Sequence, residues 1–140
     1  MFELHQQLKK DTFLIGSFPL SLLLLNNDSN YPWFILVPQR ENVKEIFELS
    51  DEDQAQLLKE SSYLSNILQK NYRPSKLNIA ALGNVVPQLH IHHIVRYKID
   101  AAWPQPVWGK VPSKPYSDEL KSLVLEKLNG ILKNNFTFKI

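Results

Sequence analysis

Two short apolar runs in the first third of the chain predict neighbouring β-strands. Residues 20–25 are all leucine apart from Ser21, and a cluster of turn-forming residues at 26–30 ends this run. Residues 33–37 form the second run, which Pro38 closes. Short apolar runs bounded by turn residues are typical of buried strands. The short polar loop between them predicts that the two strands pair in the antiparallel sense.

Two later segments carry the periodicity of amphipathic helices. The first extends from residue 51 to about residue 71, with Ser50 placed to cap it and acidic residues in its first turn. Its apolar positions recur at helical spacing, at Leu57, Leu58, Leu64, Ile67 and Leu68. The second helix begins at Ser117, and its apolar stripe consists of Leu120, Leu123, Val124, Leu128 and Ile131. We therefore predict two main helices.

The segments between and after the helices complete a predicted α+β domain of 140 residues. We expect strands at 77–82 and 88–98 around a turn at 83–86, and a helical turn or two at 42–47. The tail at 136–138 alternates like a short edge strand. The expected architecture is an antiparallel sheet of about five strands with two helices. Its parts are a core fold at 1–100, an extended segment rich in Pro and Trp at 101–116, and a C-terminal helix and tail at 117–140.

Composition and charge remove several classes of protein. Apolar residues make up 44% of the chain and charged residues 21%, which is typical of globular domains. The chain has no cysteine, so disulfides, cysteine nucleophiles and thiolate metal sites are excluded. A net charge of +2 is too weak to favour a nucleic-acid polymer as partner. The longest apolar stretch, 13–25, falls short of the ~20 residues that a bilayer span needs, so we expect no membrane association. With no secretory signal visible, we expect a cytoplasmic protein.

The candidate chemistry lies in residues 87–95, where three of the four histidines are found. In a strand, alternate side chains share a face. Gln88, His90 and His92 would then point together, while His93 points to the opposite face with its apolar neighbours. We expect His93 to pack there or at a dimer edge, without a catalytic role. The strand would thus present two imidazoles and a carboxamide in a row.

Two imidazoles side by side have three uses. They can be a structural feature of a half-exposed strand face. They can bind a metal, although a stable site needs a third or fourth ligand, and the remaining histidine, His5, is distant in the sequence. They can also perform covalent catalysis, in which one imidazole attacks phosphorus and its neighbour stabilises the charge that develops.

Residues 83–94, Gly-Asn-Val-Val-Pro-Gln-Leu-His-Ile-His-His-Ile, resemble the signature of the histidine triad (HIT) superfamily. The likeness continues upstream at Asn27-Asp28 and at 31–38, and it covers about residues 10–100. Residues 80–84 and Trp108-Gly109 resemble a bacterial subgroup described as diadenosine polyphosphate hydrolase-like. The resemblance implies an antiparallel sheet with two helices, a homodimer, and hydrolysis or transfer at the α-phosphate of a nucleotide. Diadenosine polyphosphates and nucleoside phosphoramidates are the implied substrate classes.

The resemblance also implies roles for individual residues. His90, in the middle of the triad, would attack the α-phosphorus and form a nucleotidyl-histidine that water hydrolyses. His92 would hydrogen-bond the phosphoryl oxygens. The implied substrate-binding residues are Asn84 at the phosphate, Asn78 at the end of the preceding strand, and Asn27 or Asp28 at the ribose. Separately, Trp108 belongs to an aromatic cluster with Trp103 and Tyr116 that would stack on a purine base or pin the extended segment to the core. The chemistry needs no metal cofactor, although Mg²⁺ can arrive with a polyphosphate substrate.

The sequence departs from the family pattern at three positions. Gln88 replaces the first histidine of the triad, so an orienting role survives but proton transfer does not. Val85 stands where many members carry Ser or Thr, and Trp33 where several carry a further histidine. These departures leave the nucleophile in place and change the leaving-group chemistry. The alternatives are therefore a nucleotide-binding module with weak or no catalysis, and a metal-dependent enzyme with His90 and His92 as ligands.

A homodimer is also expected from the strands and helices themselves. A single antiparallel sheet leaves two edges with unpaired backbone groups. The helix at 51–71 carries Tyr63 and Tyr72 beside a stripe that includes Leu57. We expect a two-fold contact through this helix or through a strand edge near Tyr72.

Overall fold

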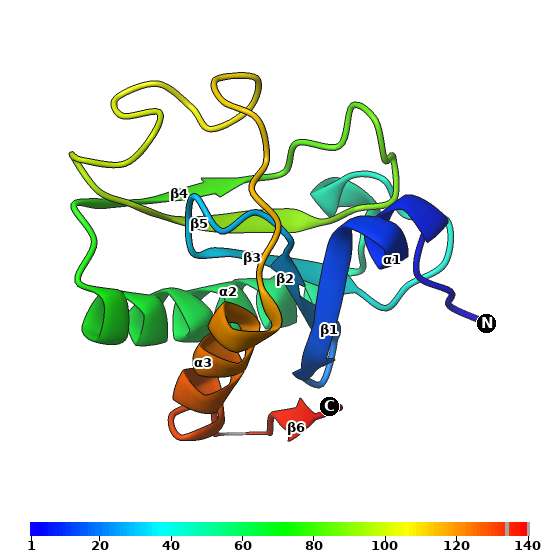
Figure 1. Ribbon diagram of the computed structural model, residues 1–140. Helices are drawn as coiled ribbons and strands as arrows, with labels where there is room; N and C mark the ends of the chain where they lie inside the picture. Colours follow the sequence, from blue (N-terminus) through cyan, green and yellow to red (C-terminus); the bar gives the residue numbers. More distant parts are fainter. Residues whose placement is uncertain (134, 140) are drawn as a thin grey trace.

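The computed structural model describes residues 1–133 and 135–139 and contains a six-stranded, fully antiparallel sheet (Figure 1). The strand order is β4-β5-β3-β2-β1-β6, so β4 and β6 form the edges. The strands are β1 (Thr12–Ser17), β2 (Ser21–Asn26), β3 (Trp33–Pro38), β4 (Lys76–Ala80), β5 (Ile91–Arg96) and β6 (Thr137–Phe138). The helices are α1 (Gln6–Asp11), the 3-10 turn η1 (Ile46–Glu48), α2 (Asp51–Tyr72) and α3 (Asp118–Asn129). The α+β class is confirmed, with one strand and one short helix more than expected.

The two predicted apolar strands are confirmed as a hairpin. β2 and β3 pair antiparallel, with Leu23 opposite Leu36. The extra strand is β1, which pairs with β2 through a bulge between Leu14 and Gly16. A Cβ on Gly16 would lie 2.2 Å from the carbonyl oxygen of Thr137, so the absence of a side chain lets the tail approach β1 closely. The expected edge strand of the tail is confirmed as β6; residues 134 and 140 of the predicted segment 117–140 lie outside the described residues.

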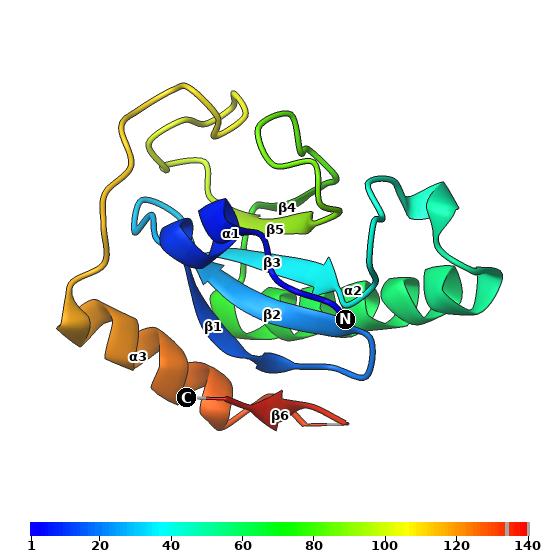
Figure 2. The same cartoon turned by 90° about the vertical axis from the view of Figure 1, so that its right-hand side faces the viewer.

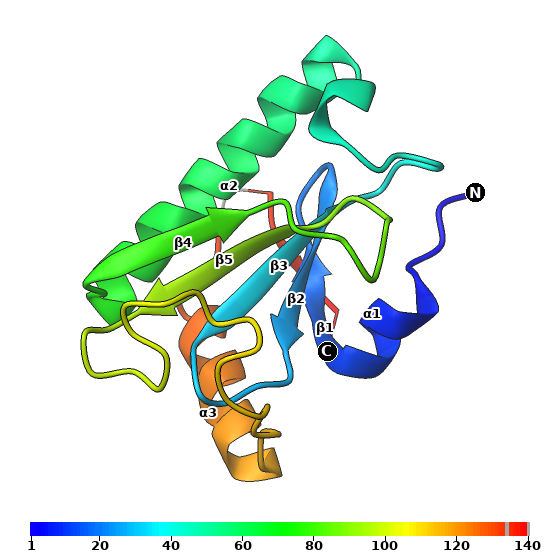
Figure 3. The same cartoon turned by 90° about the horizontal axis from the view of Figure 1, so that it is seen from above.

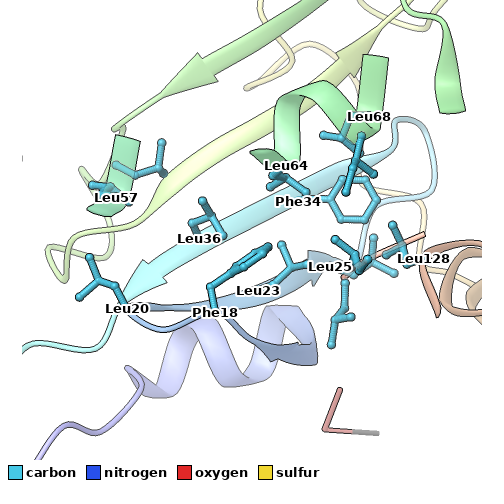
Figure 4. Packing of buried hydrophobic residues seen from close by; sticks show 14 of the residues in the cluster. Phe18, Leu20, Leu23, Leu25, Phe34, Leu36, Leu57, Leu64, Leu68 and Leu128 are labelled. Carbon is cyan, nitrogen blue, oxygen red and sulfur yellow. The ribbon is translucent and has the colours of Figure 1, made fainter. Parts of the chain in front are cut away.

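The two main helices begin where the sequence predicts, whereas α1 was not expected and the helical turn expected at 42–47 is the 3-10 turn η1 at Ile46–Glu48. The side chain of Ser50 accepts a hydrogen bond from the backbone of Asp53 and caps α2, and Ser117 caps α3 in the same way through Leu120. Arg73 ends α2 in the left-handed conformation. α2 and α3 cover one face of the sheet (Figures 1 and 2). Figure 4 shows Leu57, Leu64 and Leu68 of α2 in the core that this packing creates.

The packing of α2 contradicts the expected dimer contact at two of its residues. Leu57 is only 4% exposed and belongs to the core. Tyr63 packs edge-on against Phe18, and its hydroxyl accepts a hydrogen bond from the backbone of Lys133. Tyr72 packs partly buried against the same core. These side chains serve the interior of the chain because α2 needs a wide apolar face to cover a twisted sheet.

The opposite face of the sheet carries a second, smaller core. Its cover comes from Leu8 of α1 and from Ala102 and Val107 of the Pro/Trp-rich segment. That segment has no regular secondary structure, as predicted, and Figure 3 shows it beside the start of β3. This face of β5 also presents His92, whereas His93 belongs to the α2 face, as predicted. Among the described residues, no helix has the length and apolar character needed to cross a membrane.

The strands around the histidines are shorter than predicted, and the expected ranges 77–82 and 88–98 are wrong at their ends. β5 begins at Ile91, which pairs with Leu36. Pro38 has no backbone N–H for the next pairing site, and the N–H of Leu89 donates instead to Val43, at 2.9 Å. β4 stops at Ala80, which pairs with His92. Gln88 and His90 therefore lie in an irregular segment before the strand.

Candidate functional site

His90 lies immediately before β5. One of its ring nitrogens is hydrogen-bonded, and the other keeps its lone pair. Its Nδ1 lies 2.7 Å from the carbonyl oxygen of Gln88. A carbonyl oxygen only accepts, so Nδ1 carries the proton and Nε2 keeps its lone pair. Among the described residues, no hydrogen bond reaches Nε2. The arrangement is that of an oriented imidazole whose free nitrogen can act as a nucleophile or base.

The turn before His90 is shaped by close packing. A Cβ on Gly83 would lie 2.5 Å from the carbonyl oxygen of Val86 and 3.2 Å from Cε1 of His90. Only glycine permits the turn to lie this close to the imidazole. The predicted turn at 83–86 therefore sets the position of the ring.

His92 has both ring nitrogens engaged. Nε1–H of Trp33 donates to Nδ1 of His92 at 3.0 Å, and Nε2–H of His92 donates to the carbonyl oxygen of Leu82 at 3.1 Å. An indole N–H can only donate, so Nδ1 has to be the acceptor and Nε2 has to carry the proton. Trp33, which stands where the family pattern often has histidine, thus fixes one neutral tautomer of His92.

Burial keeps the two imidazoles neutral. Burial is the largest effect on the pKa of His90 and lowers it. The hydrogen bond to Gln88 acts in the opposite direction, and the charge of His5 adds to the lowering. Burial, followed by the neighbouring His90, lowers the pKa of His92 to about 4. At neutral pH both rings are uncharged, and Nε2 of His90 is not blocked by a proton.

Two indole rings from separate segments, those of Trp33 and Trp108, meet at the ring of His92. The ring centroids of His90 and His92 are 4.9 Å apart, so the predicted juxtaposition is confirmed. Trp108 lies edge-on to His92 at 5.0 Å and to Trp33 at 5.6 Å. The Pro/Trp-rich segment therefore delivers Trp108 directly to the site, where its indole covers His92.

Gln88 holds the N-terminal segment with its side chain. Its Oε1 accepts from the backbone N–H of His5 at 2.9 Å, and its Nε2 donates to the carbonyl oxygen of Glu3 at 2.9 Å. The side-chain amide of Gln88, which was expected to orient His90, instead bonds to residues 3–5, and it is the main-chain carbonyl of Gln88 that accepts from His90. The strand that was expected to place Gln88 beside the histidines does not extend this far.

A cavity of about 140 Å³ lies beside His90. Asn84 and Gln88 line it together with Gly83, as do Lys44 and Glu45 of the loop before η1. Asn84 thus lines the same cavity as His90, as the resemblance implies. No local pattern indicates Lys44, because its loop is held at the site by a contact distant in the sequence, the hydrogen bond from the N–H of Leu89 to the carbonyl oxygen of Val43.

The two residues expected at the ribose are engaged within the chain. Oδ1 of Asn27 accepts from the backbone N–H of Tyr116 at 2.8 Å. Asp28 is 4% exposed, and its Oδ1 accepts from the backbone of Asn30 at 3.0 Å and from that of Lys114 at 3.2 Å. Both side chains anchor the end of the Pro/Trp-rich segment.

Asn78 also serves an internal contact. Its Oδ1 accepts from the guanidinium of Arg96, which is 1% exposed. Arg96 also forms a bidentate ion pair with Asp100, at 2.8 and 3.1 Å, and donates to the carbonyl oxygen of Gln105. This buried network fixes the beginning of the segment that carries Trp108. Arg96 is thus a buried charge that is paired within the chain.

His93 has the structural role that the sequence predicts. It is fully buried; its Nδ1–H donates to the carbonyl oxygen of Ile91, and its Nε2 accepts from the hydroxyl of Ser61 on α2. Burial lowers its pKa to about 4. In the described part of the chain, no three His, Asp or Glu side chains are grouped as a metal ion would require.

The order of elements and the paired imidazoles match a known family. The family model described as HIT domain matches residues 7–99. The chain belongs to the HIT domain family. Proteins of this family bind nucleotides and act on them as hydrolases or transferases. This HIT chain was also compared with curated proteins, and none matched.

Solved HIT structures extend the similarity beyond the matched domain. A histidine triad protein from Marinobacter aquaeolei is 51% identical, with a TM-score of 0.91, and the match covers 93% of this chain and 95% of that one. A histidine triad protein from Bradyrhizobium japonicum is 46% identical, with a TM-score of 0.90 over 92% and 96% of the two chains. The third, from Sinorhizobium meliloti, is 41% identical, with a TM-score of 0.91 over 94% and 98%. The shared structure thus includes residues beyond the HIT domain proper.

Proposed function

We propose that this HIT protein cleaves a nucleotide at its α-phosphate through a nucleotidyl intermediate on His90. The observation that carries the proposal is the Nδ1–H hydrogen bond of His90 to Gln88, which orients the ring and leaves the Nε2 lone pair free. Diadenosine polyphosphates and nucleoside phosphoramidates are the substrate classes, following the resemblance of the motif. The diadenosine polyphosphate hydrolase-like subgroup belongs to this proposal.

The reaction proceeds in two displacements. Nε2 of His90 forms a bond to the α-phosphorus while the bond to the leaving group breaks, and the electron pair goes to the leaving atom. Water then attacks the same phosphorus and loses a proton to the solvent, the bond to Nε2 breaks, and its electron pair returns to the imidazole. Attack by another nucleophile in place of water gives transfer rather than hydrolysis.

His92 acts as a neutral hydrogen-bond donor in this scheme. Its Nε2–H, which faces the carbonyl of Leu82, turns to a phosphoryl oxygen when the nucleotide binds. The hydrogen bond from Trp33 keeps Nδ1 an acceptor throughout. A donor at the place where charge develops stabilises the transition state more than the bound substrate.

Leaving groups that depart as anions suit this site best. Gln88 does not titrate, and His92 stays uncharged, so neither provides a proton to a departing amine. A polyphosphate departs without a proton and brings Mg²⁺ as part of the substrate, which offsets its charge. Catalysis itself needs no protein-bound metal; the metal-dependent alternative requires His92 as a ligand, although Trp33 and Leu82 occupy both of its ring nitrogens.

A nucleotide-binding module with weak catalysis is the second candidate. The observation that favours it is the engagement of Asn27 and Asp28 with the backbone of residues 114–116, where a bound ribose would compete. Trp108 also covers His92. A binding module would retain nucleotide affinity and form no intermediate.

We also propose a homodimer that uses the β4 edge. Ile79 on β4 is 51% exposed and Leu58 on the adjacent α2 is 67% exposed. Together with Ile46 they line an apolar cavity of about 470 Å³. Two-fold pairing of β4 would satisfy its free backbone groups and cover this surface. Light scattering that gives 16.3 kDa, the mass of one chain, would contradict the dimer. The cytoplasmic location stays a prediction.

A substrate panel tests the proposed reaction. Wild-type protein and His90→Ala are incubated with a diadenosine polyphosphate, with and without Mg²⁺, and with an adenosine phosphoramidate. We expect turnover by the wild type alone. The diadenosine polyphosphate, whose leaving group departs as an anion, should be cleaved faster than the phosphoramidate. Nucleotide binding by both proteins without turnover by either would favour the binding module.

A further inference from the structure

Gln88 connects the N-terminal segment to His90. The side-chain amide of Gln88 bonds the backbone on both sides of Leu4, accepting from the N–H of His5 and donating to the carbonyl of Glu3, each at 2.9 Å. The main-chain carbonyl of the same Gln88 accepts from Nδ1–H of His90. Gln88 thus fixes the backbone of His5 and the ring of His90 at the same time.

The imidazole of His5 has a defined free end. Its Nδ1 accepts from the backbone N–H of Gln7 at 3.0 Å and so caps α1. An accepting Nδ1 places the proton of the neutral ring on Nε2, which leaves Nε2–H as a donor on an exposed side chain. The backbone N–H of His5 and the Nδ1–H of His90 both bond to Gln88, so His5 is anchored next to the residue that orients His90.

We propose that His5 is a catalytic residue of the site, whose Nε2–H donates a hydrogen bond to the departing group, with Gln88 as its positioning residue. The inference rests on the proposed function. In this arrangement the third imidazole of the site comes from the N-terminal segment, and the amide at position 88 holds it there.

The role of His5 is hydrogen bonding without proton transfer. Nε2 of His90 bonds to phosphorus, the bond to the leaving oxygen breaks, and both electrons go to that oxygen. Nε2–H of His5 donates to the oxygen as its charge grows and keeps its proton. A more basic leaving oxygen gains more from the donor, so the contribution of His5 rises with the pKa of the leaving group.

Two substitutions separate this role from helix capping. His5→Asn keeps a short side-chain acceptor, which is a good helix cap, but removes the distal donor. His5→Gln places an amide N–H near the position of the histidine Nε2 and weakens the cap. The exposed Gln6→Ala is the control at a neighbouring position.

The probes are two esters of AMP, one with 4-nitrophenol and one with the more basic phenol. We expect His5→Asn to lower kcat/KM for the phenyl ester about 10-fold and for the nitrophenyl ester less than about 3-fold, the loss of one hydrogen bond that forms in the transition state. His5→Gln should retain more activity on the phenyl ester than His5→Asn, and Gln6→Ala should match the wild type. Equal effects on both esters, or an impaired His5→Gln beside a normal His5→Asn, would overturn the proposal.

A turnover-independent measurement separates failure of this inference from failure of the proposed function. If the wild type hydrolyses neither ester, the proposed reaction is wrong, and binding of AMP decides the placement of His5. Addition of AMP should shift the ring resonances of His5 in an NMR spectrum, and the shift should disappear in Gln88→Glu, which cannot donate to Glu3. An unchanged His5 spectrum at saturating AMP would remove His5 from the site.

Discussion

His92 and His93 are consecutive in the sequence, and both are buried with a pKa lowered to about 4. Their side chains nevertheless lie on opposite faces of the sheet. His93 faces α2, where Ser61 and a backbone carbonyl satisfy it inside the large core. His92 faces the smaller core, where Trp33 fixes its tautomer beside His90. The same residue type is thus structural on one face and, in the proposed reaction, takes part in the chemistry on the other. Both rings have their two nitrogens hydrogen-bonded, so the difference lies in their surroundings: His92 lies 4.9 Å from the ring of His90, whereas His93 packs against α2.

His90→Ala should have the largest effect on turnover and should leave the stability of the fold nearly unchanged. Removing a nucleophile costs at least about 10³-fold in kcat. The fold should persist, because the ring lies before β5 and outside the α2 core. Steady-state kinetics and circular dichroism measure the two properties. Undiminished turnover by His90→Ala would contradict the proposed mechanism.

Leu64→Ala should have the converse effect. Leu64 is fully buried between α2 and the sheet, and its truncation should destabilise the protein by about 2–5 kcal/mol. Because the side chain lies on the α2 face, kcat per folded molecule should stay within about 3-fold of the wild type. Denaturant unfolding measures the stability, and active-site titration gives kcat per folded molecule. A large loss of kcat in folded protein would show that the α2 face and the histidine face are not independent.

His92→Ala should lower kcat about 10²-fold and change KM less, because its donor acts mainly in the transition state. Trp33→Phe retains the imidazole but frees Nδ1, and we expect a smaller loss of roughly 10-fold, the value of one buried hydrogen bond. An effect confined to KM would count against the role given to His92.

Acid should destabilise the protein through both histidines. Their pKa is about 4 in the folded chain against an ordinary 6.5, so the unfolded chain binds protons first. This contribution is complete above pH 6.5 and is lost as the pH falls from about 6.5 to about 4. Thermal melts across this range, compared with His93→Gln, measure it. A midpoint that is constant over the range would contradict the buried neutral rings.

Chelation should have the smallest effect. EDTA should leave phosphoramidate hydrolysis within about 2-fold of the untreated rate, since the proposed chemistry at His90 uses no metal. Cleavage of a polyphosphate should fall when Mg²⁺ is withdrawn from the substrate. A stoichiometric zinc that survives dialysis and supports activity would replace the covalent mechanism with the metal-dependent one.

The parts of the fold with local signals were predictable, and the parts that depend on distant contacts were not. The cap at Ser50, the leucine strand at 20–25 and the split between His92 and His93 each follow from a pattern within a few residues. α1 was missed because it is short and its cap is a histidine. The beginning of β5 was predicted at the wrong residue because it depends on Pro38 and Val43, which come from elsewhere in the chain.

The candidate site divides in the same way. The motif indicated His90, His92 and Asn84, which lie at or beside one cavity. The internal contacts of Asn27, Asp28 and Asn78 depend on a segment about 20 to 90 residues further along the chain, and no local pattern reveals them. The contact between Gln88 and residues 3–5 spans more than 80 positions and was equally hidden.

The central claim is that His90 carries the nucleotidyl group, and intact-mass spectrometry after rapid quenching tests it most directly. The wild type, mixed with a slow adenylyl substrate and quenched at neutral to alkaline pH, should gain the mass of one AMP residue on the peptide that contains His90, and acid should remove it. His90→Ala should show no adduct. Turnover at full rate with no adduct on His90, or an adduct on another residue, would contradict the account.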